Sequence, residues 1–375
     1  MAIRTFTRRF FIVANVITVA VFLMACANAF LHPDKWWFIA ILGLAFPFLL
    51  LLTLIFLVGW SLVRSRWIFL SLGALVLGYS NIRALVGFHF ASGFEEAKKE
   101  NTIRILTWNV KWFDEQTREK GRQSHRKEML EFIRNENADV LCFQEYFEPG
   151  PHGPYSNYKE IRKMGYPYFY RAIDYGKEGT KNEMGCAIFS KYPIVDSSRA
   201  VFNGPVKLRA AESLISCDLD VNGQTIRIYT THLQSVLLQK KDYRDISIIR
   251  NAEDSIVEAS KSLIRKLRMA YSQRGNQVDI VRNKLDSCPV PEVICGDYND
   301  VPNSYTYFRI RGNRRDAFME TAGGLGRTFS NISPTLRIDY IMPDKQFEVV
   351  QYKRKLLPYS DHYPVIADLR LGSRK

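Results

Sequence analysis

Long stretches without charge near the amino terminus constrain this chain more than any other feature of its sequence. No Asp, Glu, Lys or Arg lies between Phe10 and Leu31 or between Trp36 and Val63. Because a hydrocarbon core of about 30 Å is crossed by roughly 20 helical residues, each stretch is long enough to span a bilayer. A third apolar stretch, Trp67 to Ile82, meets Arg83, and an arginine near a helix end can reach the interface. We therefore predict two transmembrane helices and a third, interrupted span.

Buried core helices and a cleaved signal peptide both account poorly for these stretches. Buried helices of a soluble domain rarely run this far without charge. A cleaved signal peptide would explain only the first stretch, and no small-residue cleavage pattern is followed directly by a soluble domain. Residues 1–90 are therefore predicted to form a membrane anchor, followed by a polar linker at 91–101 and a separate domain at 102–375.

The formal net charge of +14 is spread unevenly along the chain. Seven Lys and Arg residues against one Asp within residues 1–90 account for +6, which leaves +8 on the remainder. Such a surplus suits an anionic partner such as nucleic acid or a phospholipid headgroup. Solvated surface side chains explain it equally well, so charge alone does not choose a partner.

Cysteine usage points to packing rather than to a site. One of the six cysteines, Cys26, lies in the first span, and the other five form no CxxC pair. Cys142, Cys186 and Cys295 each lie in an apolar run, which is typical of core thiols. Neither a zinc site nor a disulfide framework is indicated.

Short strands dominate the chain after the linker. Residues 103–110 alternate apolar with polar side chains, as a half-buried strand does, and helical spacing over 124–137 precedes an apolar strand at 138–144. A charged helical pattern, one long helix or two in series, covers 233–286 and is assigned no chemistry. The regular succession of strands favours two packed sheets. Further strands are predicted at 184–190, 211–219, 225–231, 292–296, 338–342 and 364–369.

Polar side chains with catalytic chemistry lie at the ends of several predicted strands, where loops present groups that the strand holds still. Each alone has a plainer explanation. Carboxylates at strand ends cap turns, a lone histidine is often structural, and Gly-Asp-Tyr-Asn-Asp is a turn sequence. The combination is more informative, and it comprises Asn109 in TWN, Glu145 in FQE, His232 in TTH, Asp297 and Asn299 in GDYND, Asp339 in RIDYI, and Asp361 with His362 in SDH.

These residue types suit the hydrolysis of a phosphodiester. That reaction needs a cation on the phosphate oxygens, a base that aligns water, and a donor to the leaving oxygen. Mg²⁺ takes oxygen ligands and keeps several waters, so a carboxylate such as Glu145 with a nearby amide oxygen is sufficient. Amide donors from Asn109 and Asn299, together with two histidines, can stabilise the phosphorane-like charge.

The ordered motifs TWN, FQE, TTH, GDYND, RIDYI and SDHYP resemble those of the endonuclease/exonuclease/phosphatase superfamily. That superfamily includes deoxyribonuclease I, exonuclease III, the sphingomyelinases and the inositol-polyphosphate phosphatases. The resemblance covers about residues 102–370, and the anchor marks a membrane-bound bacterial member. It implies an α/β fold, namely a four-layer α/β/β/α sandwich with the active site at one rim between the sheets, so that 102–375 would be the catalytic domain.

The resemblance also implies a role for each residue. Asp297 would position or deprotonate the attacking water, and Asn109 would lie beside both the metal and the phosphate. The metal, Mg²⁺ or Mn²⁺, would be held by Asn109, Glu145 and Asp361. His232 would hydrogen-bond the phosphate or assist the leaving group. The phosphate would also be contacted or oriented by Asn299, Asp339, His362 and Arg209.

One motif differs from that of exonuclease III and indicates which branch of the superfamily this chain resembles. Exonuclease-III-like members carry an Asn in a Tyr-x-Pro-Asn context where this chain has Thr230, Thr231, His232 and Leu233. The chain therefore resembles more closely the deoxyribonuclease-I, sphingomyelinase and tyrosyl-DNA-phosphodiesterase branches. Abasic-site endonuclease activity is not expected.

Three functions remain open at this point. The leading hypothesis is a phosphodiesterase with nucleic acid as the default substrate. The second is a hydrolase of phospholipid, sphingomyelin or inositol-phosphate headgroups, since the anchor would hold the rim near a bilayer. The third, a membrane scaffold built on an inactive fold, is disfavoured by the complete set of polar residues. Beyond the phosphoester substrate and the lipid bilayer, no obligate protein partner is inferred.

Charges around the spans predict the side of the membrane. The amino-terminal segment carries three arginines and the loop at 64–66 carries two, so both belong inside under the positive-inside rule. The loop at 32–35 balances one Asp against one Lys and fits the outside. Three spans would then place the later domain outside, which in a bacterium means a periplasmic domain on the inner membrane. With only two spans the domain would return to the cytoplasm.

Overall fold

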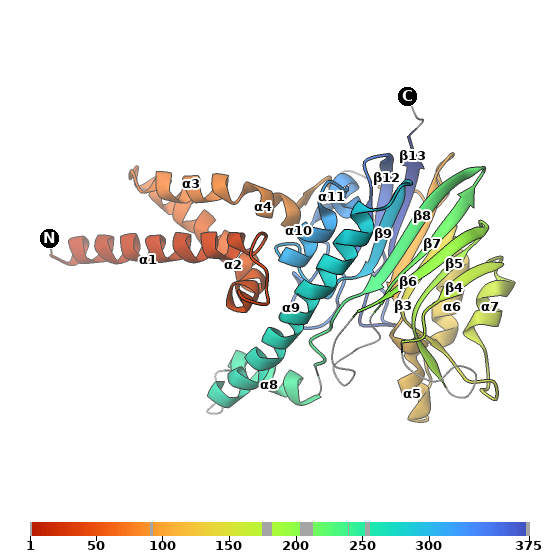
Figure 1. Cartoon of the computed structure of the whole chain (residues 1–375). Helices are drawn as coiled ribbons and strands as arrows, with labels where there is room; N and C mark the ends of the chain where they lie inside the picture. The colour runs from red at the N-terminus through yellow and green to blue at the C-terminus, as the bar shows by residue number, and fades with distance from the viewer. Residues whose placement is uncertain are drawn as a thin grey trace. The chain divides into compact units, whose positions relative to one another are not determined.

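The computed structural model describes residues 2–90, 93–174, 182–202, 213–238, 240–251 and 256–372. Within these residues the chain forms two compact units whose segments alternate along the sequence (Figure 1). The first unit takes residues 1–86, 236–276 and 301–309, and the second takes 87–235, 277–300 and 310–375. The predicted division into an anchor over 1–90, a linker over 91–101 and a domain over 102–375 stays a prediction.

The apolar stretches form helices of the first unit. Two of them, α1 (Ala2–Ala27) and α2 (Trp37–Leu62), are long and apolar enough to cross a membrane. The third stretch is broken into α3 (Ile68–Leu77) and α4 (Tyr79–Leu85), which are bent by 67° and qualify only as one interrupted span. The apolar amino-terminal helices thus agree with the predicted association with a membrane.

Polar side chains fix the order of these helices. Ser71 of α3 donates to the amide oxygen of Asn15 in α1 at 3.0 Å, and Asn81 of α4 donates to the carbonyl of Cys26 at 3.1 Å. The pairs are separated by 56 and 55 residues, so α3 and α4 run along α1 in the same direction. Such bonds between helices satisfy polar groups that have no access to water.

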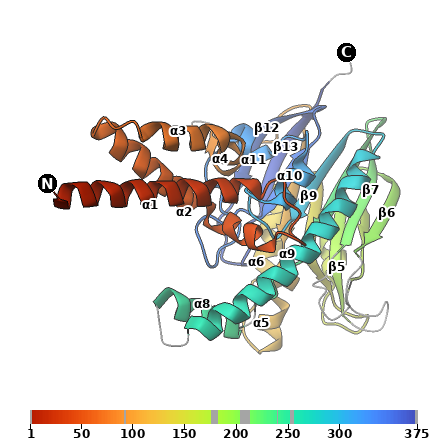
Figure 2. The ribbon, with the colours of Figure 1, turned by 60° about the vertical axis from the view of Figure 1, so that its left-hand side comes forward.

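Later segments of the chain complete the first unit. Asn303 donates to the carbonyl of Ala25 at 3.0 Å and accepts from Asn28 at its own carbonyl at 2.7 Å, while Asn81 bonds to its amide oxygen. The charged helical pattern is confirmed as two helices, α8 (Lys240–Asn251) and α9 (Ile256–Asp286). They lie side by side (Figure 2), and the ammonium of Lys266 in α9 lies 2.6 Å from the carboxylate of Asp242 in α8.

Two packed sheets form the second unit, as predicted. The six-stranded sheet has the order β12-β13-β2-β3-β5-β4, the five-stranded sheet has the order β11-β9-β8-β7-β6, and β1 pairs with β10. The strands are β1 (Gly87–Phe88), β2 (Ile103–Asn109), β3 (Val140–Glu148), β4 (Tyr168–Arg171), β5 (Glu183–Ser190), β6 (Ile194–Val201), β7 (Ser213–Val221), β8 (Gln224–His232), β9 (Glu292–Asp297), β10 (Gly323–Gly324), β11 (Asp339–Pro343), β12 (Phe347–Arg354) and β13 (Val365–Leu371).

Alternation along the strands divides the second unit into layers. Ile105 of β2 faces the core between the sheets, whereas Trp108 faces a second core beneath α6 (Arg126–Glu136). The last part of α9 lies against the five-stranded sheet, where the hydroxyl of Tyr229 donates to the carbonyl of Lys284 at 3.4 Å. This is the predicted four-layer α/β/β/α sandwich. The remaining helices are η1 (Lys111–Asp114), α5 (Glu115–Glu119), α7 (Asn157–Lys163), α10 (Tyr305–Arg311) and α11 (Ala317–Thr321).

Two expectations about the strands are wrong. β2 is buried at all seven positions, not half-buried, because it lies inside its sheet with a core on each face. Its polar side chains are paired, and the guanidinium of Arg104 donates to Asp368 at 2.7 and 2.9 Å. β3 does not end before Glu145 but continues to Glu148, with a shift of register between Phe143 and Tyr146.

Residues 93–100, expected to be part of a linker, form neither helix nor strand. They nevertheless belong to the second unit and contact its other segments. The amide of Glu95 donates to Gln351 at 3.1 Å, and Lys98 pairs with Asp139 at 2.9 Å. This segment is therefore fixed on the edge of the sandwich over the residues that the structure describes.

Gly296 allows two strands of the five-stranded sheet to approach closely. Its φ is 133°, and a Cβ at this position would lie 2.1 Å from the carbonyl oxygen of Thr231 on β8. Gly223, in the turn between β7 and β8, also has a positive φ of 85°, but a Cβ there would meet nothing within 4 Å. The two glycines thus share a positive φ and differ in the space around them.

We predict that Gly296→Ala lowers the free energy of unfolding by about 2–4 kcal/mol, because backbone strain and overpacking add. Gly223→Ala, the matched control, should cost only about 1–2 kcal/mol from its left-handed conformation. Denaturant unfolding of the full chain in detergent measures both. Equal losses for the two variants would contradict the close approach of β8 and β9.

Candidate active site

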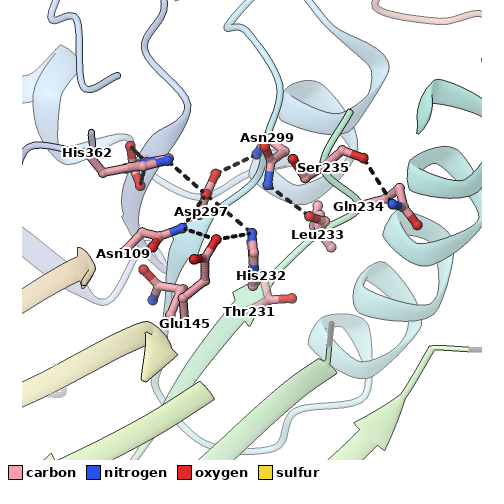
Figure 3. A network of polar contacts seen from close by, with 12 residues as sticks. Asn109, Glu145, Thr231, His232, Leu233, Gln234, Ser235, Asp297, Asn299 and His362 are labelled. Atoms are coloured by element: carbon pink, nitrogen blue, oxygen red, sulfur yellow. Dashed lines mark hydrogen bonds and ion pairs between the residues drawn. The ribbon is translucent and has the colours of Figure 1, made fainter. Parts of the chain in front are cut away.

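Each sheet contains one parallel pair of strands, and the two pairs position the site. β2 pairs with β3 so that Asn109 lies opposite Gln144, and β8 pairs with β9 so that His232 lies opposite Asp297. Parallel neighbours end at the same edge of a sheet. Figure 3 shows the side chains from both sheets pointing toward one another at this rim.

The centre of the site is a four-residue cluster drawn from both sheets. The side-chain nitrogen of Asn109 lies 3.3 Å from a carboxylate oxygen of Glu145 and 3.1 Å from one of Asp297. The Nε2 of His232 lies 3.5 Å from Asp297 and 4.0 Å from Glu145. Except for the partly exposed Glu145, these side chains are buried. The structure therefore brings four of the predicted residues into direct contact.

His362 and Asp339 form a second pair beside Asp297. The Nδ1 of His362 lies 3.1 Å from both carboxylate oxygens of Asp339, and its Nε2 lies 3.6 Å from Asp297. Asp339 begins β11 directly opposite Asp297 in the ladder with β9. The indole of Trp108 donates to the carbonyl of His362 at 2.9 Å, which fixes the backbone of the SDH segment.

Asn299 holds the turn after β9. Its backbone amide donates to Asp297 at 2.8 Å, and its side chain donates to the carbonyl of Leu233 at 2.9 Å. Its φ is 52°, a left-handed conformation that Asn tolerates better than most residues. The GDYND sequence is thus both the turn signal and a support for the Asp297 carboxylate.

Glu145 reaches the site through an irregularity in β3. It has a φ of 50°, within the shift of register between Phe143 and Tyr146. Positive φ at a non-glycine residue costs free energy and persists where the surroundings enforce it. The preceding Gln144 supplies part of that enforcement, since its side chain donates to Thr107 at 3.1 Å and, across the sheets, to Thr230 at 2.8 Å.

Sequence reasoning missed two contributors to the site. Gln144 lies inside the FQE motif, so the motif itself was the signal that could have identified it. Lys111 follows Asn109 by two residues, and its ammonium lies 2.8 Å from Asp361. Lys111, Trp112, Phe113 and Asp114 all have positive φ, and no simple sequence pattern predicts four such residues in a row.

Charge compensation sets the protonation of the second pair. Burial alone would lower the pKa of His362, but the carboxylates of Asp339 and Asp297 outweigh it and raise that pKa to about 10. Burial raises the pKa of Asp339, against the effect of His362. Burial would also raise the pKa of Asp361, yet His362 and Lys111 bring it below its usual range. The two carboxylates therefore favour the imidazolium form of His362.

The donor set fits a hard divalent cation. Ligand atoms of Asp297, Asp339 and His362 lie within 4.8 Å of one another, and the carboxylates of Asp297 and Glu145 meet at Asn109. Carboxylate and amide oxygens are the ligands that Mg²⁺ prefers, whereas a protonated imidazole donates a hydrogen bond instead. The roles of Glu145, Asn109 and Asp361 as metal ligands stay predictions, and Arg209 lies outside the described residues.

Comparison with known proteins bears directly on this site. A family model described as the endonuclease/exonuclease/phosphatase family matches residues 106–362, which include the first and last residues of the clustered site. A second family model, for a domain of unknown function, matches residues 8–85. A comparison with curated proteins finds no match.

Several solved structures share the fold, each with a TM-score of 0.50. An endonuclease/exonuclease/phosphatase protein of Beutenbergia cavernae is 21% identical and covers 73% of this chain and 72% of its own. The human Nocturnin catalytic domain with bound sulfate is 18% identical, with 73% and 96% covered. TDP2 of D. rerio in complex with a single-strand DNA product is 15% identical, with 72% and 99% covered.

These likenesses show the α/β/β/α fold, and the family match extends over most of the chain. The family consists of phosphoester hydrolases that typically use a divalent metal. Residues 106–362 contain every clustered side chain described above. The chain therefore belongs to the endonuclease/exonuclease/phosphatase family and is a phosphoester hydrolase.

Proposed function

We propose that this protein is a membrane-anchored, Mg²⁺- or Mn²⁺-dependent phosphodiesterase in which water attacks phosphorus directly. The observation that carries the proposal is the meeting of Asn109, Glu145, His232 and Asp297 at one rim, where Asn109 and His232 each lie 3.1 to 4.0 Å from both carboxylates. The imidazolium of His362 adds a cation beside them. Carboxylates, an amide and two histidines are the groups that phosphoryl hydrolysis requires.

Each polar residue at the rim has its own role in the proposed reaction. Asp297 is held by donors on both oxygens, the Asn299 amide and the Asn109 side chain, so it can orient and deprotonate a water without moving. His362 donates from Nε2 to a non-bridging phosphate oxygen while Asp339 fixes its Nδ1. His232 assists the leaving oxygen. A bound divalent cation at Glu145 and Asn109 would supply positive charge toward the phosphate.

Nucleic acid is the default substrate in this proposal. The D. rerio TDP2 structure of the same fold holds a single-strand DNA product, which supports a phosphodiester in nucleic acid. The alternative substrate is a phospholipid, sphingomyelin or inositol-phosphate headgroup. It is favoured by the two apolar helices that are long enough to cross a bilayer.

Hydrolysis by the full chain in detergent tests the proposal. DNA, RNA, phospholipids and inositol phosphates are offered in parallel with Mg²⁺, and a chromogenic phosphodiester reports generic activity. We expect turnover that chelator abolishes and that Mg²⁺ or Mn²⁺ restores. Asp297→Asn, His232→Ala and His362→Ala should each lower kcat by roughly 10²- to 10⁴-fold with little effect on unfolding. Full activity in excess chelator, or near-normal rates in two of these variants, would contradict the assigned roles.

The imidazolium of His362 generates a pH prediction. Since its pKa is raised to about 10, the active cation is present at neutral pH and is lost as the pH rises through that value. Asp339→Asn removes the largest effect that raises this pKa and leaves burial, which lowers it. We expect Asp339→Asn to lower kcat. In addition, the alkaline limb of the pH profile of kcat should move to lower pH. Asp361→Asn, whose carboxylate contributes less, is the control and should move the limb less.

Helix order supports a location for the second unit. α3 and α4 run along α1 in the same direction, so that if this bent pair is one span, the chain crosses three times and leaves the helices at the end opposite to where it begins. We propose that the positive-inside rule then places the hydrolase outside the cytoplasm, on the periplasmic side of the inner membrane in a bacterium.

A pair of reporters fused after Lys375 tests this location. One reporter is active only when exported and the other only in the cytoplasm. We expect signal from the first alone. A variant that lacks residues 64–86, which contain α3 and α4, should reverse the two signals because an even number of passes remains. Signal from the cytoplasmic reporter on the full chain would contradict the three-pass arrangement.

A further inference from the structure

One face of α9 in the first unit carries cations and apolar side chains together. Between Ile256 and Asn276 the sequence holds five Lys or Arg residues and a single acid, Glu258. Several exposed positions are three or four residues apart, the spacing of one helix face, and Glu258 and Met269 are exposed beside them. We call five of these exposed residues the α9 face: Val257, Lys261, Ile264, Arg265 and Arg268.

The same face of α9 continues into a contact with the turn between α1 and α2. A Cβ at Gly275 would lie 2.6 Å from Pro33, so the helix backbone packs directly on this turn. The hydroxyl of Ser272 donates to Asp34. Positions 275, 272, 268, 265 and 261 follow one another at helical spacing, and Figure 2 shows this part of α9 running on beyond the turn.

Arg268 connects this part of α9 to the start of α2. Its guanidinium lies 5.3 Å from the ring of Trp37, the first residue of α2. Tryptophans at the end of a span mark the interface between hydrocarbon and headgroups. A helix that leaves the turn beside Trp37 therefore runs at the depth of the headgroups.

We propose that the α9 face lies on the bilayer surface and binds anionic phospholipid headgroups. The inference rests on the proposed membrane anchoring by α1 and α2. Lys261, Arg265 and Arg268 would pair with headgroup phosphates, while Val257 and Ile264, which are 53% and 42% exposed, would enter the acyl boundary. Exposed apolar side chains between the cations favour a bilayer over a nucleic acid, which has no hydrocarbon layer to receive them.

A fluorescent probe on the α9 face tests the proposal in the full chain. NBD is attached at Ile264→Cys in a Cys288→Ser background, because the other cysteines are buried. Nanodiscs are made from phosphatidylcholine alone or mixed with phosphatidylglycerol. We expect NBD to be shielded from water and quenched by lipid-borne nitroxide in the mixed discs. Added salt should weaken this, because exposed charges are screened.

Charge reversal provides the matched comparison. One cation near an anionic surface changes a partition constant roughly fivefold, so loss of three cations alone weakens the contact about a hundredfold, and Lys261→Glu, Arg265→Glu and Arg268→Glu together should weaken it at least that much. Lys159→Glu, Arg162→Glu and Lys163→Glu, three exposed cations of α7, make the same change in net charge and should leave the NBD signal unchanged.

A second probe separates this inference from the anchoring itself. NBD at Leu52→Cys in α2 reports whether the span enters the disc. The probe at position 52 can be quenched while the α9 probe stays exposed to water in both lipids. That result would support the membrane anchoring and show that the α9 proposal is wrong. If neither probe is quenched, both proposals are wrong. Shielding of the α9 probe by single-stranded DNA but not by mixed discs would assign the face to nucleic acid and overturn the proposal.

Discussion

Buried negative charge is the constraint on which the arrangement at the rim depends. Asp297 and Asp339 lie opposite each other in the β9–β11 ladder, and both are buried. Carboxylates taken out of water cost several kcal/mol unless they are paired and hydrogen-bonded. The Asn109 amide, the Asn299 backbone and the protonated His362 supply that compensation.

Neither sheet alone supplies all the side chains of the active site. Asn109 and Glu145 come from the six-stranded sheet, and His232, Asp297 and Asp339 come from the five-stranded sheet. Gln144 joins the sheets beneath them by its bond to Thr230, where both partners are buried. A phosphoester would therefore bind to a rim whose two halves are held in register by packing in the interior.

Much of the site could be predicted from the sequence because short motifs carry it. TWN, TTH and GDYND mark the ends of strands, and their side chains meet as the resemblance implied. Pairing between strands is a tertiary property, so the burial of β2 and the passage of β3 through Glu145 could not be read from local alternation. The edge strand β6 was missed because its side chains are largely exposed and polar. The pairing of Lys111 with Asp361 depends on a left-handed turn, and this turn contains no glycine from which it could have been predicted.

The asparagines of the first unit have a consequence for how the chain is made. Asn81 meets Asn303 across a separation of 222 residues. At 5–20 residues per second, synthesis of that interval takes roughly ten to forty seconds. The apolar helices are therefore complete long before the segment that pairs with Asn28 and Asn81 exists. During that interval their amides must be hydrated or paired elsewhere, and the unit closes only after the strands of both sheets up to β9 have been synthesised.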